Sequence, residues 1–279
     1  MPAQSARFGS VQPQDLVITM CGAHLRRPGD RVWSAGMVEL LAEFGFSTEA
    51  ARAALSRLVT RDYLARVKVG RMVQYTLTPR SQELLADGDR RIFTFGRGAP
   101  AADAWTMVWH AVPDDRRVER SRLASQLRFL GFGSLQDATW IAASDREQEV
   151  RLLLRRLGVE EFAAVLVGRL SRGSEPALLL SGAWDLEELA RIYDDFLREF
   201  GPYAQPGTEL ADREAFLVRT RMLHAFRGFS QLDPELPGNP ARRSEIVHTF
   251  DAVYARLADQ ADAHFAAVAG TELDAGAAA

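Results

Sequence analysis

The order of secondary-structure signals in residues 16–78 restricts the fold more than any other feature of the sequence. Three helical patterns follow one another: an apolar run at 16–25, an amphipathic segment at 35–43, and a segment that ends near Arg61. Apolar residues of the third segment recur at three- and four-residue spacing, which indicates one buried face. The chain therefore begins with three short helices that need a shared core.

Capping signals mark the ends of these predicted helices. Ser34 can cap the second helix, and Gly45 suits its C-terminus, where a left-handed residue often ends a helix. Ser47 and Thr48 both offer an N-cap for the third helix. The short interval between Gly45 and Ser47 predicts a tight turn between the second and third helices.

A predicted β-hairpin follows the third helix. Residues 63–78 are rich in β-forming side chains, and Val69-Gly70-Arg71 can turn between two strands. Three helices followed by a hairpin are typical of a winged helix-turn-helix, in which one helix enters the major groove of DNA. Residues 81–87 predict a short linking helix after the hairpin.

Positive charge is concentrated in this part of the chain. Residues 50–80 contain seven Arg and Lys residues and one acid, a net charge of +6. The whole protein carries −3, so the remainder carries −9. A basic segment on an otherwise acidic protein is typical of a surface that binds a polyanion.

We expect the third helix and the hairpin to supply the DNA contacts. Arg on the helix can read guanine through paired hydrogen bonds, whereas basic residues beside the hairpin turn can meet phosphate. The alternative is that some of these arginines pair with Glu43, Glu49 or Asp62. The predicted DNA-binding residues are Thr48, Arg52, Ser56, Arg57, Arg61, Lys68 and Arg71.

The rest of the chain predicts two further domains. A Gly- and Ala-rich stretch at 95–103 separates the basic segment from a β-α-β-α-β order typical of a ferredoxin-like sandwich. Its strands are expected at 105–112, 139–142 and 162–170, and its helices at 118–130 and 146–157. Long helices are expected at 184–200, 213–229 and 244–269. We therefore predict an α+β protein with a winged helix-turn-helix at 15–97, a ferredoxin-like domain at 103–175 and a helical domain at 183–270.

Catalytic and metal-binding patterns are not found in the sequence. The five histidines are scattered without metal-ligand spacing, and Cys21 lies in an apolar helix, where it is expected in the core. We therefore expect no enzyme, no metal and no cofactor. One alternative stays open: Asp114 or Asp115, after the first strand of the ferredoxin-like segment, could bind a metal as in some nucleases of that shape, although both also fit a solvated loop.

The cysteine content and the lack of membrane or signal segments predict where the protein is located. A single cysteine is typical of a reducing compartment. No apolar run reaches the roughly 18–20 residues of a membrane helix, and the first residues have no signal-peptide pattern. We expect a cytoplasmic protein that does not bind membranes.

These segments together resemble the PaaX family, which contains repressors of phenylacetic acid catabolism and related transcription regulators. The matching segments are residues 29–64 and 67–78, residues 105–144, WDLEELARIYDDFLREF at 184–200, and FRGFSQLDPELPGNP at 226–240. The resemblance implies a dimeric winged-helix repressor with a central domain similar to a CRISPR-adaptation nuclease fold. It also implies release from DNA by an aryl-acyl-CoA such as phenylacetyl-CoA.

Partners and effector site are expectations on the same basis. One reading helix covers few base pairs, so we expect a homodimer on double-stranded DNA with an inverted-repeat operator. Arginines near residue 117 could meet the ADP phosphates of CoA, or simply face solvent on a charged helix. Aromatic residues could line an acyl pocket, although at this spacing they also fit a core. The candidate effector-binding residues are Trp109, Arg117, Trp184 and Arg227.

Overall fold

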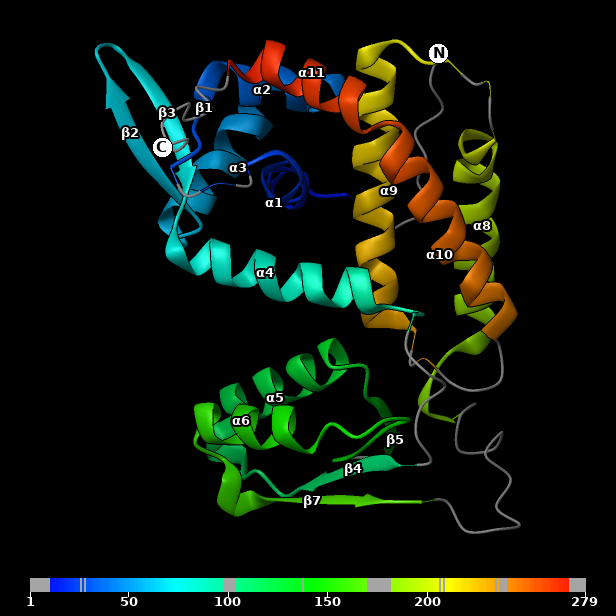
Figure 1. The fold of residues 1–279 in the computed structure, drawn as a ribbon. Coiled ribbons are helices and arrows are strands. Elements are labelled where there is room, and N and C mark those ends of the chain that lie inside the picture. The colour runs from blue at the N-terminus through cyan, green and yellow to red at the C-terminus, as the bar shows by residue number, and fades with distance from the viewer. Residues whose placement is uncertain are drawn as a thin grey trace, which may run out of the picture. The chain divides into compact units, whose positions relative to one another are not determined.

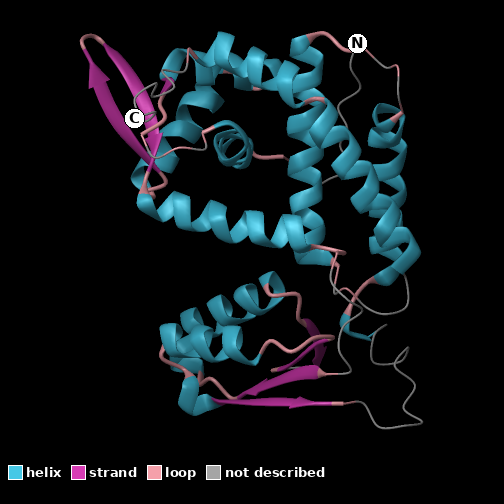
Figure 2. Ribbon diagram, in the orientation of Figure 1, coloured by secondary structure: helices cyan, strands magenta, loops and turns pink. Residues whose placement is uncertain are grey.

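The computed structural model is an α+β structure, with helices and two small antiparallel sheets in the part of the chain that it describes (Figures 1 and 2). The described residues are 11–25, 27, 29–97, 104–136, 138–169, 182–205, 207, 209–233, 235 and 240–270. The chain forms two compact units, treated separately below. The first contains residues up to 93, 195–227 and 248 onward, and the second contains 94–194 and 228–247. Part of the predicted boundary at 95–103, residues 98–103, lies outside the described residues.

The first unit begins with the predicted series of helices and a hairpin. The helices are α1 (Pro13–His24), α2 (Ser34–Glu43) and α3 (Thr48–Thr60), and the hairpin strands are β2 (Leu64–Val69) and β3 (Met72–Leu77). An additional strand, β1 (Val32–Trp33), was not expected. It pairs with β3, so the sheet order is β1-β3-β2, antiparallel throughout.

The turn between α2 and α3 forms through the predicted capping residues, but the predicted cap at the start of α2 does not form. Gly45 has φ +88°, and the Phe46 N–H donates to the Leu41 carbonyl, so the end of α2 is closed as expected. Ser47 Oγ accepts from the Ala50 N–H at 3.2 Å and caps α3. The prediction that Ser34 caps α2 was wrong: Trp33 is the N-cap residue, because it is paired in β1 and the chain leaves the strand only after it.

The linking helix is longer than the sequence indicated. It was expected at 81–87, but α4 covers Pro79–Thr94. Leu85 and Ile92, two helical turns apart, are both buried. Their packing stabilises a helix through Gly88, where local propensity alone would favour a stop.

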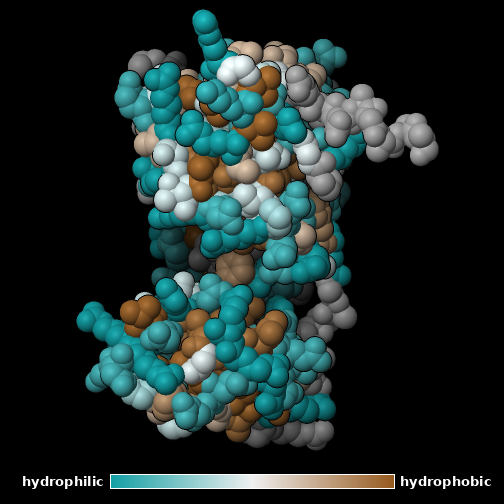
Figure 3. All heavy atoms as spheres, turned by 90° about the vertical axis from the view of Figure 1, so that its left-hand side faces the viewer, coloured by the Kyte–Doolittle hydropathy of each residue, from teal (hydrophilic) through white to brown (hydrophobic). Residues whose placement is uncertain are grey.

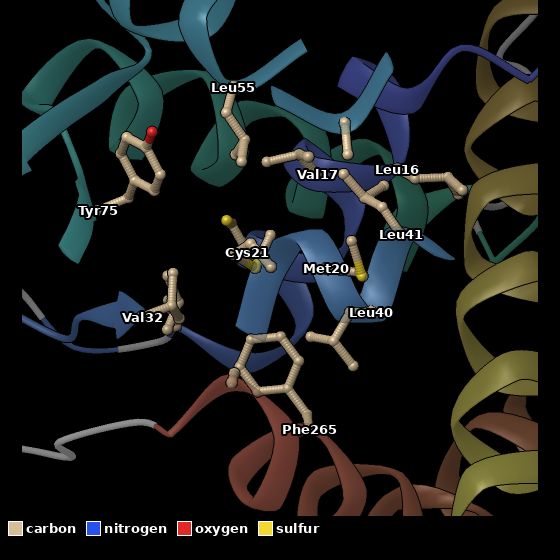
Figure 4. Close-up of a cluster of buried hydrophobic side chains, with 14 of the residues drawn as sticks. Leu16, Val17, Met20, Cys21, Val32, Leu40, Leu41, Leu55, Tyr75 and Phe265 are labelled. Carbon is tan, nitrogen blue, oxygen red and sulfur yellow. The ribbon is translucent and has the colours of Figure 1, made fainter. Parts of the chain in front are cut away.

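The core of the first unit combines side chains from both ends of the chain. Figure 4 shows Phe265 pointing into a cluster of α1 and α2 side chains that includes Met20 and Leu40. Phe216 from α9 (Asp212–Leu232) belongs to the same cluster and is fully buried. The three N-terminal helices therefore share their core with C-terminal helices, which the pattern of residues 16–78 did not indicate.

The last helical segment is divided in two. A single helix was expected at 244–269, but the chain forms α10 (Pro240–Arg256) and α11 (Ala258–Ala269), with Leu257 between them at φ −94° and ψ 8°. The break allows α11 to lie against α2. At Gly36, an added Cβ would lie 2.3 Å from the Val268 carbonyl oxygen, so the two helices approach too closely for any side chain there.

The second unit contains a four-stranded antiparallel sheet, with order β5-β6-β4-β7, and two helices. Its elements are β4 (Trp105–His110), α5 (Arg117–Phe129), β5 (Gly133–Gln136), β6 (Thr139–Ala142), α6 (Glu147–Leu157) and β7 (Ala163–Gly168). The predicted β-α-β-α-β order thus lacked one strand, β5. Four residues that begin with glycine show no clear alternation, and pairing with β6 is what makes them a strand.

Helix α8 (Leu186–Ala204) begins later and ends later than the predicted 184–200. Asp185 Oδ1 accepts from the Glu188 N–H at 2.8 Å, so Asp185 caps the helix and Trp184 lies before it. Helix α9 extends the predicted 213–229 by a few residues. The surface and the helix lengths can also be compared with what a membrane requires. Among the described helices, none is long and apolar enough to cross a membrane. The face drawn in Figure 3 is mostly hydrophilic, with hydrophobic residues scattered over it.

Candidate DNA interface

Helix α3 exposes one stripe of polar side chains. Thr48, Arg52 and Ser56 recur at four-residue spacing and are all exposed. Ala51, Leu55 and Leu58 occupy the opposite side and are buried in the unit core. The packing of α3 therefore brings the predicted reading residues together on a surface that a groove could cover.

Arg52 in this stripe and the adjacent Arg57 both have polar neighbours. Arg52 lies close enough to Glu49 to lower the pKa of that carboxyl, although backbone and Ser47 hydrogen bonds lower it more. The Arg57 Nε donates to Gln14 Oε1 on α1 at 3.1 Å. Both arginines are exposed, so DNA can compete for them. The contact between Arg57 and Gln14 had no signal in the sequence, because the partners lie 43 residues apart.

Arg61 lies at the C-cap of α3, with an exposed side chain. Its carbonyl oxygen accepts from Arg80 Nη1 at 2.9 Å, and the Arg80 guanidinium stacks over the Tyr63 ring at 4.7 Å. Arg80 thus connects the start of α4 to the end of α3. Of the basic residues in this segment, Arg80 has these structural contacts, whereas Arg61 presents its charge to solvent.

The hairpin carries its positive charge at the tip. Val69 pairs with Met72, which leaves a two-residue turn of Gly70 and Arg71, and Gly70 has φ +59°. Lys68 and Arg71 are exposed, and Met72 beside them is 58% exposed. An exposed basic pair at the tip of a hairpin suits phosphate or the minor groove.

We expect Lys68→Ala and Arg71→Ala each to weaken binding to all DNA sequences about equally. Each loss of a phosphate contact should reduce the slope of log K against log salt by about 1. Titrations at several salt concentrations, on specific and random duplexes, measure this. Arg71→Lys keeps the charge and serves as control. A change confined to one sequence would contradict a phosphate-binding role.

The candidate effector residues belong to two different units of the chain. Arg227 lines a cavity of about 340 Å³ within the first unit. Trp109, Arg117 and Trp184 belong to the second unit, where Trp109 is 51% exposed on β4 and Arg117 is exposed at the start of α5. Trp184 packs over Gly133, whose added Cβ would lie 2.6 Å from the indole.

Asp114 and Cys21 were considered for catalysis, and the structure shows what surrounds each of them. Asp114 is highly exposed and accepts from Arg120 Nη1 at 2.7 Å, so this carboxylate already has a cationic partner. Within the described ranges, no group of three or more His, Cys, Asp or Glu side chains could hold a metal ion. Cys21 is fully buried, as predicted, and burial raises the pKa of its thiol to about 12.

One comparison with a solved structure concerns the fold. An uncharacterized protein, Rv0674 from Mycobacterium tuberculosis, superposes with a TM-score of 0.53. The match covers 91% of this chain and 98% of that chain, with 21% sequence identity. This similarity shows a shared fold and nothing about activity.

Comparisons of sequence identify the family. Residues 12–81 match the model of PaaX-like proteins, 98–180 match the central Cas2-like domain of PaaX proteins, and 184–267 match the PaaX-like C-terminal domain. The transcriptional repressor PaaX of Escherichia coli (strain K12) is 26% identical over 238 residues, which cover 81% of this chain and 73% of that protein. With three matches in order along it and this relative, the chain belongs to the PaaX family of transcriptional regulators.

Proposed function

We propose that this protein is a transcriptional repressor that binds operator DNA through α3 and the β2–β3 hairpin. The observation that carries the proposal is the exposed stripe of Thr48, Arg52 and Ser56, which overlaps residues 50–80, the segment with a net charge of +6. Relatives support the class, since the chain resembles a protein described as a transcriptional repressor. A repressor of this kind acts in the cytoplasm, where it meets the chromosome.

The same proposal assigns domains to the chain. Helices α1 to α3 and the hairpin have the order of a winged helix-turn-helix, which we assign to 15–97. The β-α-β-β-α-β order and the sheet order β5-β6-β4-β7 support a ferredoxin-like domain at 103–175. Residues 183–270 form the helical domain in this division.

The effector in this proposal is an aryl-acyl-CoA such as phenylacetyl-CoA, which releases the repressor from a catabolic operon. The resemblance to the PaaX family implies this effector, and similarity to a protein described as a transcriptional repressor supports the regulatory role. A ligand lowers DNA affinity only if it binds the DNA-free shape of the protein more tightly than the DNA-bound shape. Release therefore requires an effector site whose shape depends on the position of the reading helix.

Recovery of genomic fragments bound by the protein tests this function. We expect the fragments to lie upstream of genes for aromatic acid breakdown, and phenylacetyl-CoA to release the protein from them. Incubation of plasmid DNA with and without magnesium provides the control for a nuclease. Recovery of random fragments with the same affinity, or cleavage that depends on magnesium, would contradict a repressor.

We also expect the operator to be an inverted repeat bound by a homodimer. Two-fold symmetry places two reading helices about 34 Å apart, which matches one turn of DNA between half-site centres. Footprinting of a recovered fragment should show two protected half-sites, and light scattering should give the mass of a dimer. Protection of one unpaired half-site by a monomer would rule this arrangement out.

A further inference from the structure

The cavity of about 340 Å³ in the first unit has walls from both ends of the chain. Helices α1 and α4 form one side, and α9 and α10 contribute to the other. Figure 1 shows α4 running from the hairpin toward α9, with α1 beside it. Most of the lining is apolar, as in sites for small organic ligands. The larger apolar lining residues are Leu25, Leu77, Leu85, Ile92, Phe93 and Leu223.

Polar groups line the same cavity. Arg227 Nη1 donates to Thr19 Oγ1 at 3.3 Å, and both side chains line the cavity with Asp89. Burial lowers the pKa of Arg227, and the carboxylates of Asp89 and Asp15 oppose that shift. The guanidinium is thus a cation whose charge is balanced by neighbouring acids.

This charge balance selects among possible ligands. An oxygen acceptor on the ligand can hydrogen-bond to the guanidinium, sharing it with Thr19 or replacing that contact. A free carboxylate would add a negative charge close to Asp89, which is unfavourable at short range. A neutral carbonyl, as in a thioester or an amide, avoids this repulsion and still accepts the hydrogen bond.

We propose that this cavity binds the acyl group of the effector, with an aromatic ring among the apolar side chains and a neutral thioester carbonyl on Arg227. The inference rests on the proposed function, because it places the effector of that repressor. A cavity of about 150 Å³ holds a benzene molecule, so the volume here accommodates a ring with an acyl group. A complete CoA thioester does not fit, and its polar part leaves past Ala86 and Asp89, which are exposed.

Two helices that line the cavity also adjoin the elements proposed to bind DNA. Helix α1 packs directly on α3, and α4 begins two residues after β3 ends. The helices α1 and α4 approach closely at Gly22, where an added Cβ would lie 2.7 Å from Leu85 Cδ2. A ligand that separates α1 from α4 therefore shifts both the reading helix and the hairpin. Such a ligand binds the DNA-free and DNA-bound shapes of the protein with different affinities.

The experiment uses two substitutions on α4 of the full-length protein. Ala86→Leu adds a side chain in the cavity wall, whereas Glu83→Leu adds a similar side chain on the same helix outside the cavity. Calorimetry measures binding of phenylacetyl-CoA, phenylacetate and free CoA, and fluorescence anisotropy measures operator affinity with each compound. Arg227→Met, which keeps the aliphatic stem, tests the carbonyl contact.

We expect Ala86→Leu and Arg227→Met to keep operator affinity within about twofold while phenylacetyl-CoA binds at least tenfold more weakly. Glu83→Leu should behave as wild type, and wild type should bind phenylacetyl-CoA more tightly than phenylacetate. An unchanged response in Ala86→Leu would overturn the cavity assignment and leave the repressor function standing. Wild type that binds operator but ignores phenylacetyl-CoA would overturn the proposed effector, and this inference with it. Tighter binding of phenylacetate would overturn the preference for a neutral carbonyl.

Discussion

Asp233→Ala should lower the free energy of unfolding of the second unit by about 3–5 kcal/mol, the cost of leaving one partner of a buried ion pair. The Asp233 side chain is 1% exposed and its partner Arg243 is 11% exposed. Arg243 donates two hydrogen bonds to the carboxylate, at 2.7 and 2.9 Å. Removal of Asp233 therefore leaves a guanidinium charge with little water to solvate it.

A third side chain completes this cluster. Tyr193 O–H donates to Asp233 Oδ2, and the Glu235 N–H donates to Oδ1 at 2.7 Å. Burial and the Asp233 carboxylate raise the pKa of Tyr193 far above its ordinary value, so the phenol keeps the proton that it donates. The cluster ties Tyr193 in the first half of α8 to the end of α9 and to α10, which explains why its loss is expected to be costly.

Urea unfolding followed by tryptophan fluorescence measures this effect, because four of the five tryptophans lie in residues 94–194. The matched control is Asp194→Ala, which breaks the ion pair of Asp194 with the neighbouring Arg242. Those side chains are 45% and 41% exposed, so the loss should not exceed about 1 kcal/mol. If both variants lose the same small amount, the Asp233 cluster does not stabilise the fold as we describe.

Operator binding should fail most completely in the double variant Arg52→Ala/Arg57→Ala. Each arginine that makes paired bonds to guanine is worth about 1–3 kcal/mol, so the pair should cost about 2–6 kcal/mol if the effects add. Anisotropy titration of a recovered operator fragment measures the loss, and a random duplex shows how much of it is sequence-specific. Unchanged operator affinity would exclude α3 as the reading helix.

Two control variants separate DNA contact from structural roles. Arg198→Ala removes an exposed arginine on α8, which pairs with Asp195, and should leave operator affinity unchanged. Gln14→Ala removes the partner of Arg57 on α1. If Arg57 acts only by holding α1, Gln14→Ala should weaken DNA binding as much as Arg57→Ala. If Arg57 contacts DNA, Gln14→Ala should have little effect.

Local patterns in the sequence determined several elements of this protein. The Ser47 cap and the Gly45 terminus of α2 depend on backbone groups within a few residues, so their signals are short and readable. The exposed stripe on α3 followed from helical spacing alone, because apolar residues at three- and four-residue intervals must share the buried side. The basic segment was likewise visible from composition.

Only the tertiary structure decided how distant segments combine. The full length of α4 and the break at Leu257 depend on partners far along the chain, which outweigh weak local propensities. Strand β5 forms because it pairs with the nearby strand β6, not because its own residues favour a strand. Phe265 and Phe216 enter the core of α1 and α2 across some two hundred residues, and no local spacing encodes such a contact. The cavity at Arg227 exists for the same reason: its walls are formed by helices that meet only after folding.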